Sequence, residues 1–455
     1  MKCQPEPGGS DVSSALNLAF AGAFGIEVKV RSLLQYGFGS GFACCDGDIL
    51  AETALNCKAN SFLGTEMSIQ PILDKALAGE RLSADDCTAL LESYDIARIG
   101  AAADEIRRRK NPGDVVTYII DRNINYTNVC NVVCTFCAFY RRPGKPDTYV
   151  HSIDEICSRI DETIALGGTG VLMQGGLHPD FNIEWYEDLL STLHAKYPNF
   201  QLHCFSPPEI HNISLISKLD YETILRRLKA AGLNSMPGGG GEILDDEVRK
   251  RVSTKCTTQE WLDVMRAVHK VGLISTATMM FGIGDRIEHR VRHLERIRQV
   301  QDEALANKAV DPNYGEFTAF IPWTFQRENT ALGRKITEEP TGIDYLKMLS
   351  VSRLFLDNIQ HIQSSWLTQG IRLGQTALRF GADDMGSIMI EENVVSAAGA
   401  HNEANERDLR YQIREAGFRP QQRDILYNYI DRDDTASLDQ SDSLKLKQLT
   451  VAFAD

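Results

Sequence analysis

The chain has 455 residues, of which 43% are hydrophobic and 24% are charged. This composition is that of an ordinary globular protein, long enough for one large domain with additions. Its 48 basic and 62 acidic residues give a formal net charge of −14. Because the phosphates of nucleic acids repel an acidic surface, and no basic stripe with interleaved aromatic residues occurs, we expect no nucleic-acid partner.

The sequence also argues against a membrane protein and against export. The longest apolar stretch near the start, residues 15–28, is interrupted by Asn17 and Glu27. It falls short of the ~20 apolar residues that a membrane-spanning helix needs. The eleven cysteines show no paired spacing outside one group of three, which favours reduced thiols. We therefore expect a cytoplasmic protein without a membrane partner.

The first two segments of the chain differ in pattern. Residues 1–66 are rich in Gly, Ala and Ser. We expect them to be either a misassigned start, with Met67 as the true first residue, or a disordered extension. Over residues 67–112 apolar positions recur at helical spacing, and Ser83 is a candidate helix N-cap. This second segment is therefore predicted to form N-terminal helices.

From about residue 113, apolar β-rich runs alternate with amphipathic helical stretches. Repeated β-α units of this length predict a parallel sheet. Eight such units fit a closed (β/α)8 barrel of the TIM type over residues 113–392, with an open doubly wound sheet as the alternative. Seven helical stretches separate the eight expected strands, which cover residues 115–124, 171–174, 201–205, 233–236, 274–281, 316–322, 361–365 and 385–390.

Two further segments follow the eighth expected strand. Residues 393–430 contain a helical stretch at 404–415, so we expect them to form a helical C-terminal cap. Residues 431–455 are acidic and rich in Ser, which predicts a solvated tail. The fold class is thus α/β, a (β/α)8 barrel with helical additions at both ends.

Three cysteines, Cys130, Cys134 and Cys137, follow the first expected strand with the spacing C-x3-C-x2-C. Three thiolates can hold three irons of a [4Fe–4S] cluster and leave the fourth iron open, whereas electron-transfer ferredoxins normally supply four cysteines. The alternatives are unrelated thiols or a zinc site, but zinc usually takes two separated pairs of ligands. No second C-x2-C pair occurs, and His289 and His293 lie far downstream in a charged helical stretch.

The spacing, with the aromatic Phe136 directly before the last cysteine, is similar to the signature of the radical S-adenosylmethionine (SAM) enzymes. In those enzymes the open iron chelates SAM, and an electron from the reduced cluster splits SAM into methionine and a 5′-deoxyadenosyl radical. The resemblance implies one [4Fe–4S] cluster held by Cys130, Cys134 and Cys137, with SAM as a consumed co-substrate. The cofactor carries that chemistry, and the protein supplies position and electrostatics.

Functional residues of a barrel gather at the C-terminal ends of its strands. The run Gln174-Gly175-Gly176 follows the second expected strand, and glycines allow the backbone to approach a ligand closely. Exposed carbonyls there can accept hydrogen bonds from the ammonium group of SAM. The alternative is a tight βα turn without a ligand.

The ends of the third and fourth expected strands carry two carboxylates. Glu209 and Glu242 can hydrogen-bond hydroxyl groups or act as bases, although an exposed surface carboxylate is the ordinary expectation. Glu242 follows the glycine run 238–241, where a phosphate-binding loop would need a Lys and a Ser or Thr. A surface approached by a ribose or an amino-acid group fits this run better, with a flexible turn as the alternative.

Aromatic residues occupy the ends of later strands. Trp323, Phe325 and Trp366 are candidates for stacking on flat rings, but aromatic residues at strand ends are often part of a core.

Residues 67–429 resemble the radical SAM dehypoxanthine futalosine cyclases of the futalosine route to menaquinone. The stretch NINYTN at 123–128 is typical of this family and of its relatives, aminofutalosine synthase and the two halves of FO synthase. Residues 1–66 have no counterpart in the family. The segments that point to the cyclases are GLHPD at 176–180, FSPPEI at 205–210, SMPGGG at 235–240, FTAFIPW at 317–323, SWLTQG at 365–370 and EENVV at 391–395.

The resemblance implies a reaction on dehypoxanthine futalosine. A hydrogen is abstracted from its ribose, the sugar radical attacks the attached benzoate ring, and loss of an electron and a proton gives cyclic dehypoxanthine futalosine. An external electron donor such as a flavodoxin or a ferredoxin is implied, and no general base is assigned. The alternative activities are those of aminofutalosine synthase or an FO synthase subunit.

The same resemblance assigns positions around the cofactors. It places Phe136 near the cluster, with its backbone toward the adenine of SAM. It places Gln174, Gly175 and Gly176 against the methionine part of SAM. Ser206 and Glu242 are expected to contact SAM or the substrate.

Overall fold

The structure is a computed structural model that describes residues 68–431. The expected extension, 1–66, and all but the first residue of the expected tail lie outside the described residues. Within the described residues three helices precede the first strand, and Ser83 caps the second of them by accepting a hydrogen bond from the Asp86 N–H, as predicted. These helices are α2 (Gln70–Leu77), α3 (Ala84–Glu92) and α4 (Ile96–Lys110).

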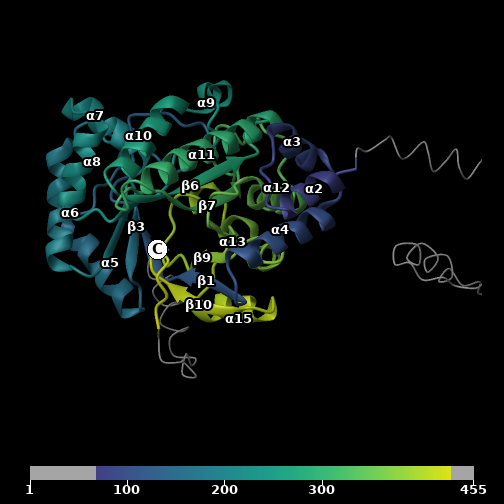
Figure 1. Cartoon of the computed structure of the whole chain (residues 1–455). Coiled ribbons are helices and arrows are strands. Elements are labelled where there is room, and N and C mark those ends of the chain that lie inside the picture. The colour runs from purple at the N-terminus through teal and green to yellow at the C-terminus, as the bar shows by residue number, and fades with distance from the viewer. Residues whose placement is uncertain (1–67, 432–455) are drawn as a thin grey trace, which may run out of the picture. The chain divides into compact units, whose positions relative to one another are not determined.

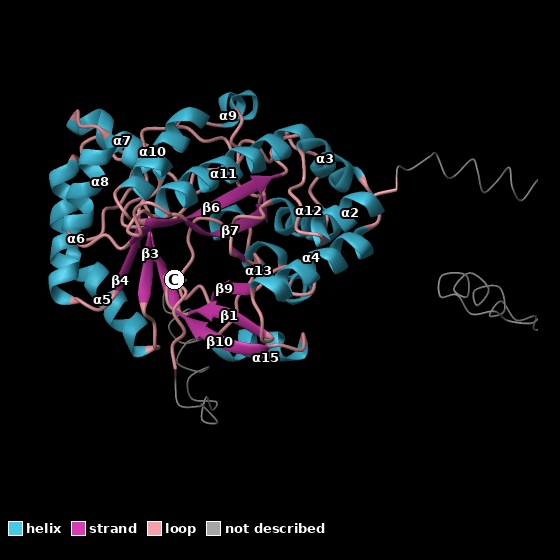
Figure 2. Ribbon diagram, in the orientation of Figure 1, coloured by secondary structure: helices cyan, strands magenta, loops and turns pink. Residues whose placement is uncertain are grey.

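A parallel barrel forms the centre of the described residues, with helices around its outer face (Figures 1 and 2). Seven strands, β2 to β8, pair in sequence order, and β9 pairs with β1. A bridge between Gln363 and Asp384 connects the end of β8 to β9, and only Ile120 separates β1 from β2, so the pairings complete a ring. The strands are β1 (Val115–Ile119), β2 (Asp121–Ile124), β3 (Gly170–Met173), β4 (Gln201–Cys204), β5 (Ser235–Met236), β6 (Ile274–Phe281), β7 (Phe317–Thr324), β8 (His361–Ile362) and β9 (Asp384–Ser387).

Polar side chains cap the N-termini of several helices that connect these strands. Ser152, Thr257 and Thr341 each accept a hydrogen bond from the backbone three residues on, in a capping box. None of the helices in residues 68–431 has both the length and the apolar character needed to cross a bilayer. The connecting helices are α5 (Ile153–Ala165), α6 (Ile183–Lys196), α7 (Pro207–Ser217), α8 (Tyr221–Ala230), α9 (Asp246–Val252), α10 (Thr258–Lys270), α11 (Ile287–Lys308), α12 (Gly342–Phe355), α13 (Trp366–Gln369) and α14 (Ile371–Ala377).

The first expected strand, 115–124, is divided in the structure. Its first half, β1, pairs with β9 and with the late strand β10 (Arg419–Arg423), whereas its second half, β2, pairs with β3. A change of partner at Ile120 therefore divides what the sequence predicts as one strand.

The segment 393–430, expected to be helical, also contains this strand. Besides η3 (Ser396–Ala398) and α15 (Glu406–Glu415), the chain forms β10 on the edge of the sheet formed by β10, β1 and β9. The sequence of β10, RPQQR, has no apolar alternation. Pro420 is tolerated because an edge strand leaves one side without ladder hydrogen bonds. Backbone pairing rather than side-chain pattern thus defines this strand.

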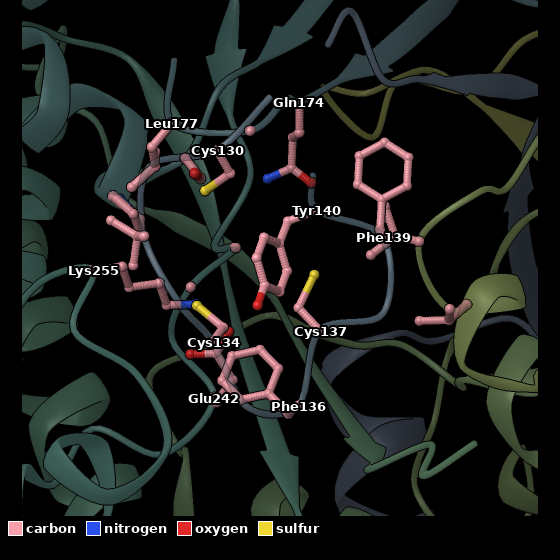
Figure 3. Close-up of a pocket in the computed structure, with 18 of the residues that line it drawn as sticks. Cys130, Cys134, Phe136, Cys137, Phe139, Tyr140, Gln174, Leu177, Glu242 and Lys255 are labelled. Atoms are coloured by element: carbon pink, nitrogen blue, oxygen red, sulfur yellow. The ribbon is translucent and has the colours of Figure 1, made fainter. Parts of the chain in front are cut away.

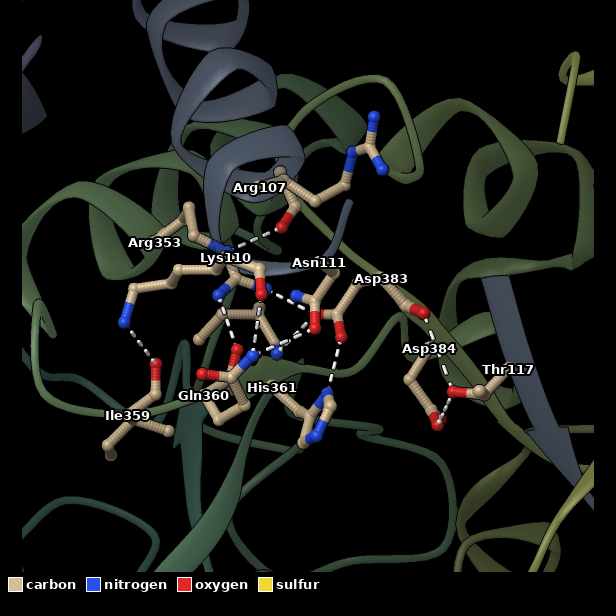
Figure 4. A network of polar contacts seen from close by, with 12 residues as sticks. Arg107, Lys110, Asn111, Thr117, Arg353, Ile359, Gln360, His361, Asp383 and Asp384 are labelled. Atoms are coloured by element: carbon tan, nitrogen blue, oxygen red, sulfur yellow. Dashed lines mark hydrogen bonds and ion pairs between the residues drawn. The ribbon is translucent and has the colours of Figure 1, made fainter. Parts of the chain in front are cut away.

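Buried charges fasten α12 and β8 to the β9 edge of the barrel (Figure 4). The Arg353 side chain has no exposed surface and pairs with Asp383, whose other carboxylate oxygen lies 2.5 Å from the His361 Nδ1. Arg353 also donates to the carbonyls of Gly381 and Gln360, each at 2.8 Å. Because Arg353 and Asp383 are both buried and each is hydrogen-bonded to groups of more than one element, the cluster holds these elements in one arrangement.

Candidate active site

The three cysteines lie in the loop after β2 and face one cavity of about 260 Å³ (Figure 3). Cys130 is fixed by its N–H, which donates to the Arg141 carbonyl at 2.8 Å. The Cys137 N–H donates to the Cys134 carbonyl at 3.1 Å, which makes a tight turn between these two residues. All three are free thiols. The spacing seen in the sequence therefore becomes a three-sulfur face on one cavity.

Side chains of the stretch NINYTN, which precedes the cysteines, hydrogen-bond this loop to residues 147–149. The Asn128 side chain donates to the Asp147 carbonyl at 2.8 Å and accepts from the Tyr149 N–H at 2.9 Å. The Thr127 hydroxyl donates to the Tyr149 carbonyl at 2.7 Å. Amide and hydroxyl side chains are needed here because they replace the missing ladder bonds of an irregular loop.

The donor set fits an iron–sulfur cluster. Three soft thiolate ligands with free access to a cavity suit a [4Fe–4S] cluster that keeps one iron open, and they leave a structural zinc site, which takes four protein ligands, one ligand short. Burial raises the pKa of the Cys134 thiol to about 12, although the Lys255 cation acts in the opposite direction. Iron would replace the proton that such a buried thiol otherwise keeps.

Neighbouring protein atoms leave no room for a side chain at the two glycines of the run after β3. A Cβ on Gly175 would lie 2.5 Å from the Tyr126 ring, and a Cβ on Gly176 would lie 2.2 Å from the Val129 carbonyl oxygen. Gln174 and both glycines line the cavity. The Gln174 carbonyl accepts from the Asn125 side chain at 3.2 Å. The run thus packs directly on the cysteine loop and completes one wall of the cavity.

Glu209 is buried at the wall of the same cavity, so the expectation of a surface carboxylate is wrong. Only 1% of the residue is exposed. It accepts hydrogen bonds from the Ser206 hydroxyl at 2.5 Å, the Tyr126 hydroxyl at 2.7 Å and the Gly175 N–H at 3.1 Å. Burial raises the pKa of this carboxyl to about 7, although these hydrogen bonds lower it. The proline pair after β4 begins α7 at once and turns Glu209 inward.

Glu242 lines the cavity as part of an ion pair. Its carboxylate lies 2.5 Å from the Lys255 Nζ and 3.8 Å from the Arg249 guanidinium. Lys255 also lies over the ring of Phe136, 5.0 Å from the ring centre. Sequence analysis missed Lys255, because a lysine in the charged run 249–255 carries no signal of burial.

A second cavity of about 270 Å³, here called the inner cavity, lies inside the barrel. It shares Gln174, Glu242 and Trp323 with the cysteine cavity, so the two spaces adjoin. Phe325 lines the cysteine cavity, whereas Trp366 is core, with its Nε1 donating to the Ser387 carbonyl at 3.0 Å. The polar side chains around the inner cavity include Asp121, His203, Thr276, Thr278, Thr318, Gln363 and Ser387.

The two histidines with zinc-like spacing are structural. Both are fully buried in α11. The His293 Nδ1 accepts from the Leu244 N–H and the His289 Nδ1 accepts from the Arg286 N–H, each at 2.9 Å. The two histidines therefore accept hydrogen bonds from backbone N–H groups and take no part in the cysteine site.

Two family models match the chain. The model of the radical SAM superfamily matches residues 124–297, and that of the CofH/MqnC C-terminal region matches residues 313–436. The second match covers the end of the barrel together with η3, α15 and β10.

Relatives of known name match over most of their length. The chain is 47% identical to a cyclic dehypoxanthine futalosine synthase of Halalkalibacterium halodurans, over 80% of this chain and 95% of that protein. It is 42% identical to the protein of the same name from Streptomyces coelicolor, over 80% of this chain and 89% of that protein. It is 35% identical to an aminodeoxyfutalosine synthase of Thermus thermophilus, over 79% of this chain and 95% of that protein.

Among solved structures, methylornithine synthase is similar with a TM-score of 0.59 at 19% identity, over 78% of this chain and 97% of that one. The fold, the three-cysteine face and the superfamily match together define a radical SAM enzyme. Within this superfamily, the chain belongs to the family of the cyclic dehypoxanthine futalosine synthases. The expectations of a [4Fe–4S] cluster and of SAM are thereby confirmed.

Proposed function

We propose that the protein converts dehypoxanthine futalosine into cyclic dehypoxanthine futalosine, a ring closure in menaquinone biosynthesis. The observation that carries this proposal is the three-thiol face on a cavity that adjoins a second cavity inside the barrel. When bound, the cluster and SAM supply a 5′-deoxyadenosyl radical that abstracts hydrogen from an unactivated carbon. The protein's part is to hold both partners and to exclude competing reactants.

In this proposal Cys130, Cys134 and Cys137 hold the cluster. Gln174, Gly175 and Gly176 face the methionine part of SAM, because they line the cavity beside Cys130. Phe136 stands near the cluster, with its backbone toward the adenine. Ser206, which lies just after β4, and Glu242, in the loop after β5, contact SAM or the substrate.

The inner cavity receives the substrate in this proposal. Its hydroxyl, amide and carboxyl side chains can hydrogen-bond a sugar, and Trp323, where the cavities adjoin, offers a flat face for the benzoate ring. Polar groups in such a cavity orient a ligand, while the apolar surface removes it from water. The substrate would therefore lie with its reacting carbon toward the cysteine cavity.

We further propose that the protein works in the cytoplasm with an external one-electron donor such as a flavodoxin or a ferredoxin. The free thiols of the described residues support a reducing setting.

The test is substrate-dependent cleavage of SAM. The reconstituted, reduced protein is incubated with SAM and either dehypoxanthine futalosine or the paired substrates 5-amino-6-(D-ribitylamino)uracil and tyrosine, and 5′-deoxyadenosine is measured. We expect stimulation by dehypoxanthine futalosine alone. Stimulation by the second pair would assign the chain to the activity named for other relatives of the same group.

A further inference from the structure

The last residue of α9 and the three residues after it, 252–255, lie directly against the cysteine loop. The Thr135 N–H and hydroxyl both donate to the Val252 carbonyl, at 2.8 and 3.1 Å. Cys134 and Ser253 form an antiparallel bridge. This segment, called the 252–255 segment below, is therefore held in register with Cys134 by main-chain bonds.

Ser253 directs its hydroxyl at the sulfur of Cys134. The two atoms, Ser253 Oγ and Cys134 Sγ, lie 3.0 Å apart. The same oxygen accepts a hydrogen bond from the Lys255 N–H at 3.2 Å. Because an iron-bound thiolate can only accept, and because the oxygen already has a donor on another side, the hydroxyl proton is free to be donated to the sulfur.

Lys255 brings a positive charge to the same place (Figure 3). Only 10% of its side chain is exposed, and its Nζ lies 2.5 Å from the Glu242 carboxylate. Arg249, with 5% of its side chain exposed, lies 3.8 Å from the same carboxylate. Two cations with little exposed surface thus lie within 4 Å of one carboxylate beside the cysteine cavity.

We propose that the 252–255 segment raises the reduction potential of the cluster through Ser253 and Lys255, and that Glu242 lowers this potential. Reduction adds one negative charge to the cluster, and that electron comes from an external donor. A hydrogen bond to a ligating sulfur and a nearby buried cation both stabilise the added charge, since screening by water is weak there. Ser253 and Lys255 act through the cluster, so they are positioning residues. The proposal rests on the proposed function only in requiring the cluster.

The test is a reductive titration of the cluster, followed by electron paramagnetic resonance, on full-length protein without SAM or substrate. Ser253→Ala and Lys255→Met should each lower the midpoint potential. Glu242→Gln, which leaves Lys255 without its counter-charge, should raise it. Ser253→Thr keeps a hydroxyl and should stay close to the unchanged protein. Lys250→Met, at an exposed residue of α9, removes the same charge away from the cavity and should leave the potential unchanged.

The opposite signs make the proposal falsifiable even if one variant loads iron poorly. Unchanged potentials in iron-loaded Ser253→Ala and Lys255→Met would overturn it, and so would a fall in Glu242→Gln. If Lys255→Met fails to hold iron, the signs of the shifts in midpoint potential of Ser253→Ala and Glu242→Gln decide. Shifts of the expected sign in a protein that does not cyclise dehypoxanthine futalosine would refute the proposed function and leave this inference standing.

Discussion

The Tyr126 hydroxyl donates a 2.7 Å hydrogen bond to the Glu209 carboxylate, and this bond joins the loop after β2 to the first turn of α7. The Tyr126 ring packs edge-on against Phe205, with ring centres 6.2 Å apart. Glu209 in turn accepts from the Gly175 N–H. One buried carboxyl group therefore connects the ends of three consecutive strands beneath the cysteine loop.

Tyr126→Phe should destabilise the fold and weaken cluster binding. It removes one donor from a buried carboxyl group while keeping the ring, which costs about 1–3 kcal/mol. Urea unfolding and iron content measure the two effects. Tyr411→Phe, at a half-exposed tyrosine of α15, is the control and should change neither.

Glu209 should give stability a pH dependence. Its folded pKa, about 7, lies above its ordinary value of 4.5 because of burial. Between these values the folded state binds more protons than the unfolded state, so the free energy of unfolding falls as pH rises from about 4.5 to 7. The loss is roughly 3 kcal/mol. Unfolding across this window should show a shallower fall for Glu209→Gln, and equal slopes would contradict the assignment.

Gly176→Ala should disrupt the cluster site. The added methyl group would lie 2.2 Å from the Val129 carbonyl oxygen and 3.1 Å from the Cys130 Cβ. Because the first of these is backbone, the cysteine loop has to shift. We expect a loss of bound iron, measured after reconstitution. The matched control is Gly342→Ala, whose methyl group would meet only the end of the Leu373 side chain at 3.1 Å.

Arg353→Met should strongly destabilise the barrel. It leaves the Asp383 carboxylate buried without its main counter-charge, and such a loss costs roughly 3–5 kcal/mol. The same substitution at Arg226, whose side chain is 59% exposed in its pair with Glu222, should cost less than about 1 kcal/mol. Similar losses of unfolding free energy in the two variants would contradict the role given to the buried pair.

Cys137→Ala should abolish cluster assembly, because two thiolates cannot replace three. The characteristic iron–sulfur absorbance and the cleavage of SAM should both be lost. Cys157→Ala alters a thiol buried in α5, away from the cavity, and should keep both. Retention of a full cluster in Cys137→Ala would show that this cysteine is not a ligand.

Local patterns predict the barrel and the cysteine face well. The β-α alternation indicates parallel strands, and the short C-x3-C-x2-C run keeps three sulfurs within one loop, which faces one cavity in the structure. β10 was missed because its pairing depends on backbone bonds to β1, some 300 residues earlier in the chain.

The burial of Glu209 and Lys255 could not be read from the sequence either. Each becomes buried only through contacts across the barrel: Glu209 with Tyr126, and Lys255 with Glu242. A charged residue is ordinarily exposed, and the sequence does not mark the exceptions that tertiary partners create.

The most direct test of the whole account is the mass of the product. Reconstituted, reduced protein is incubated without oxygen with SAM and dehypoxanthine futalosine, and the products are followed by mass spectrometry. The account predicts a product that is two hydrogens lighter than the substrate, together with an equal amount of 5′-deoxyadenosine. Absence of SAM cleavage by a protein with a full, reduced cluster would contradict it.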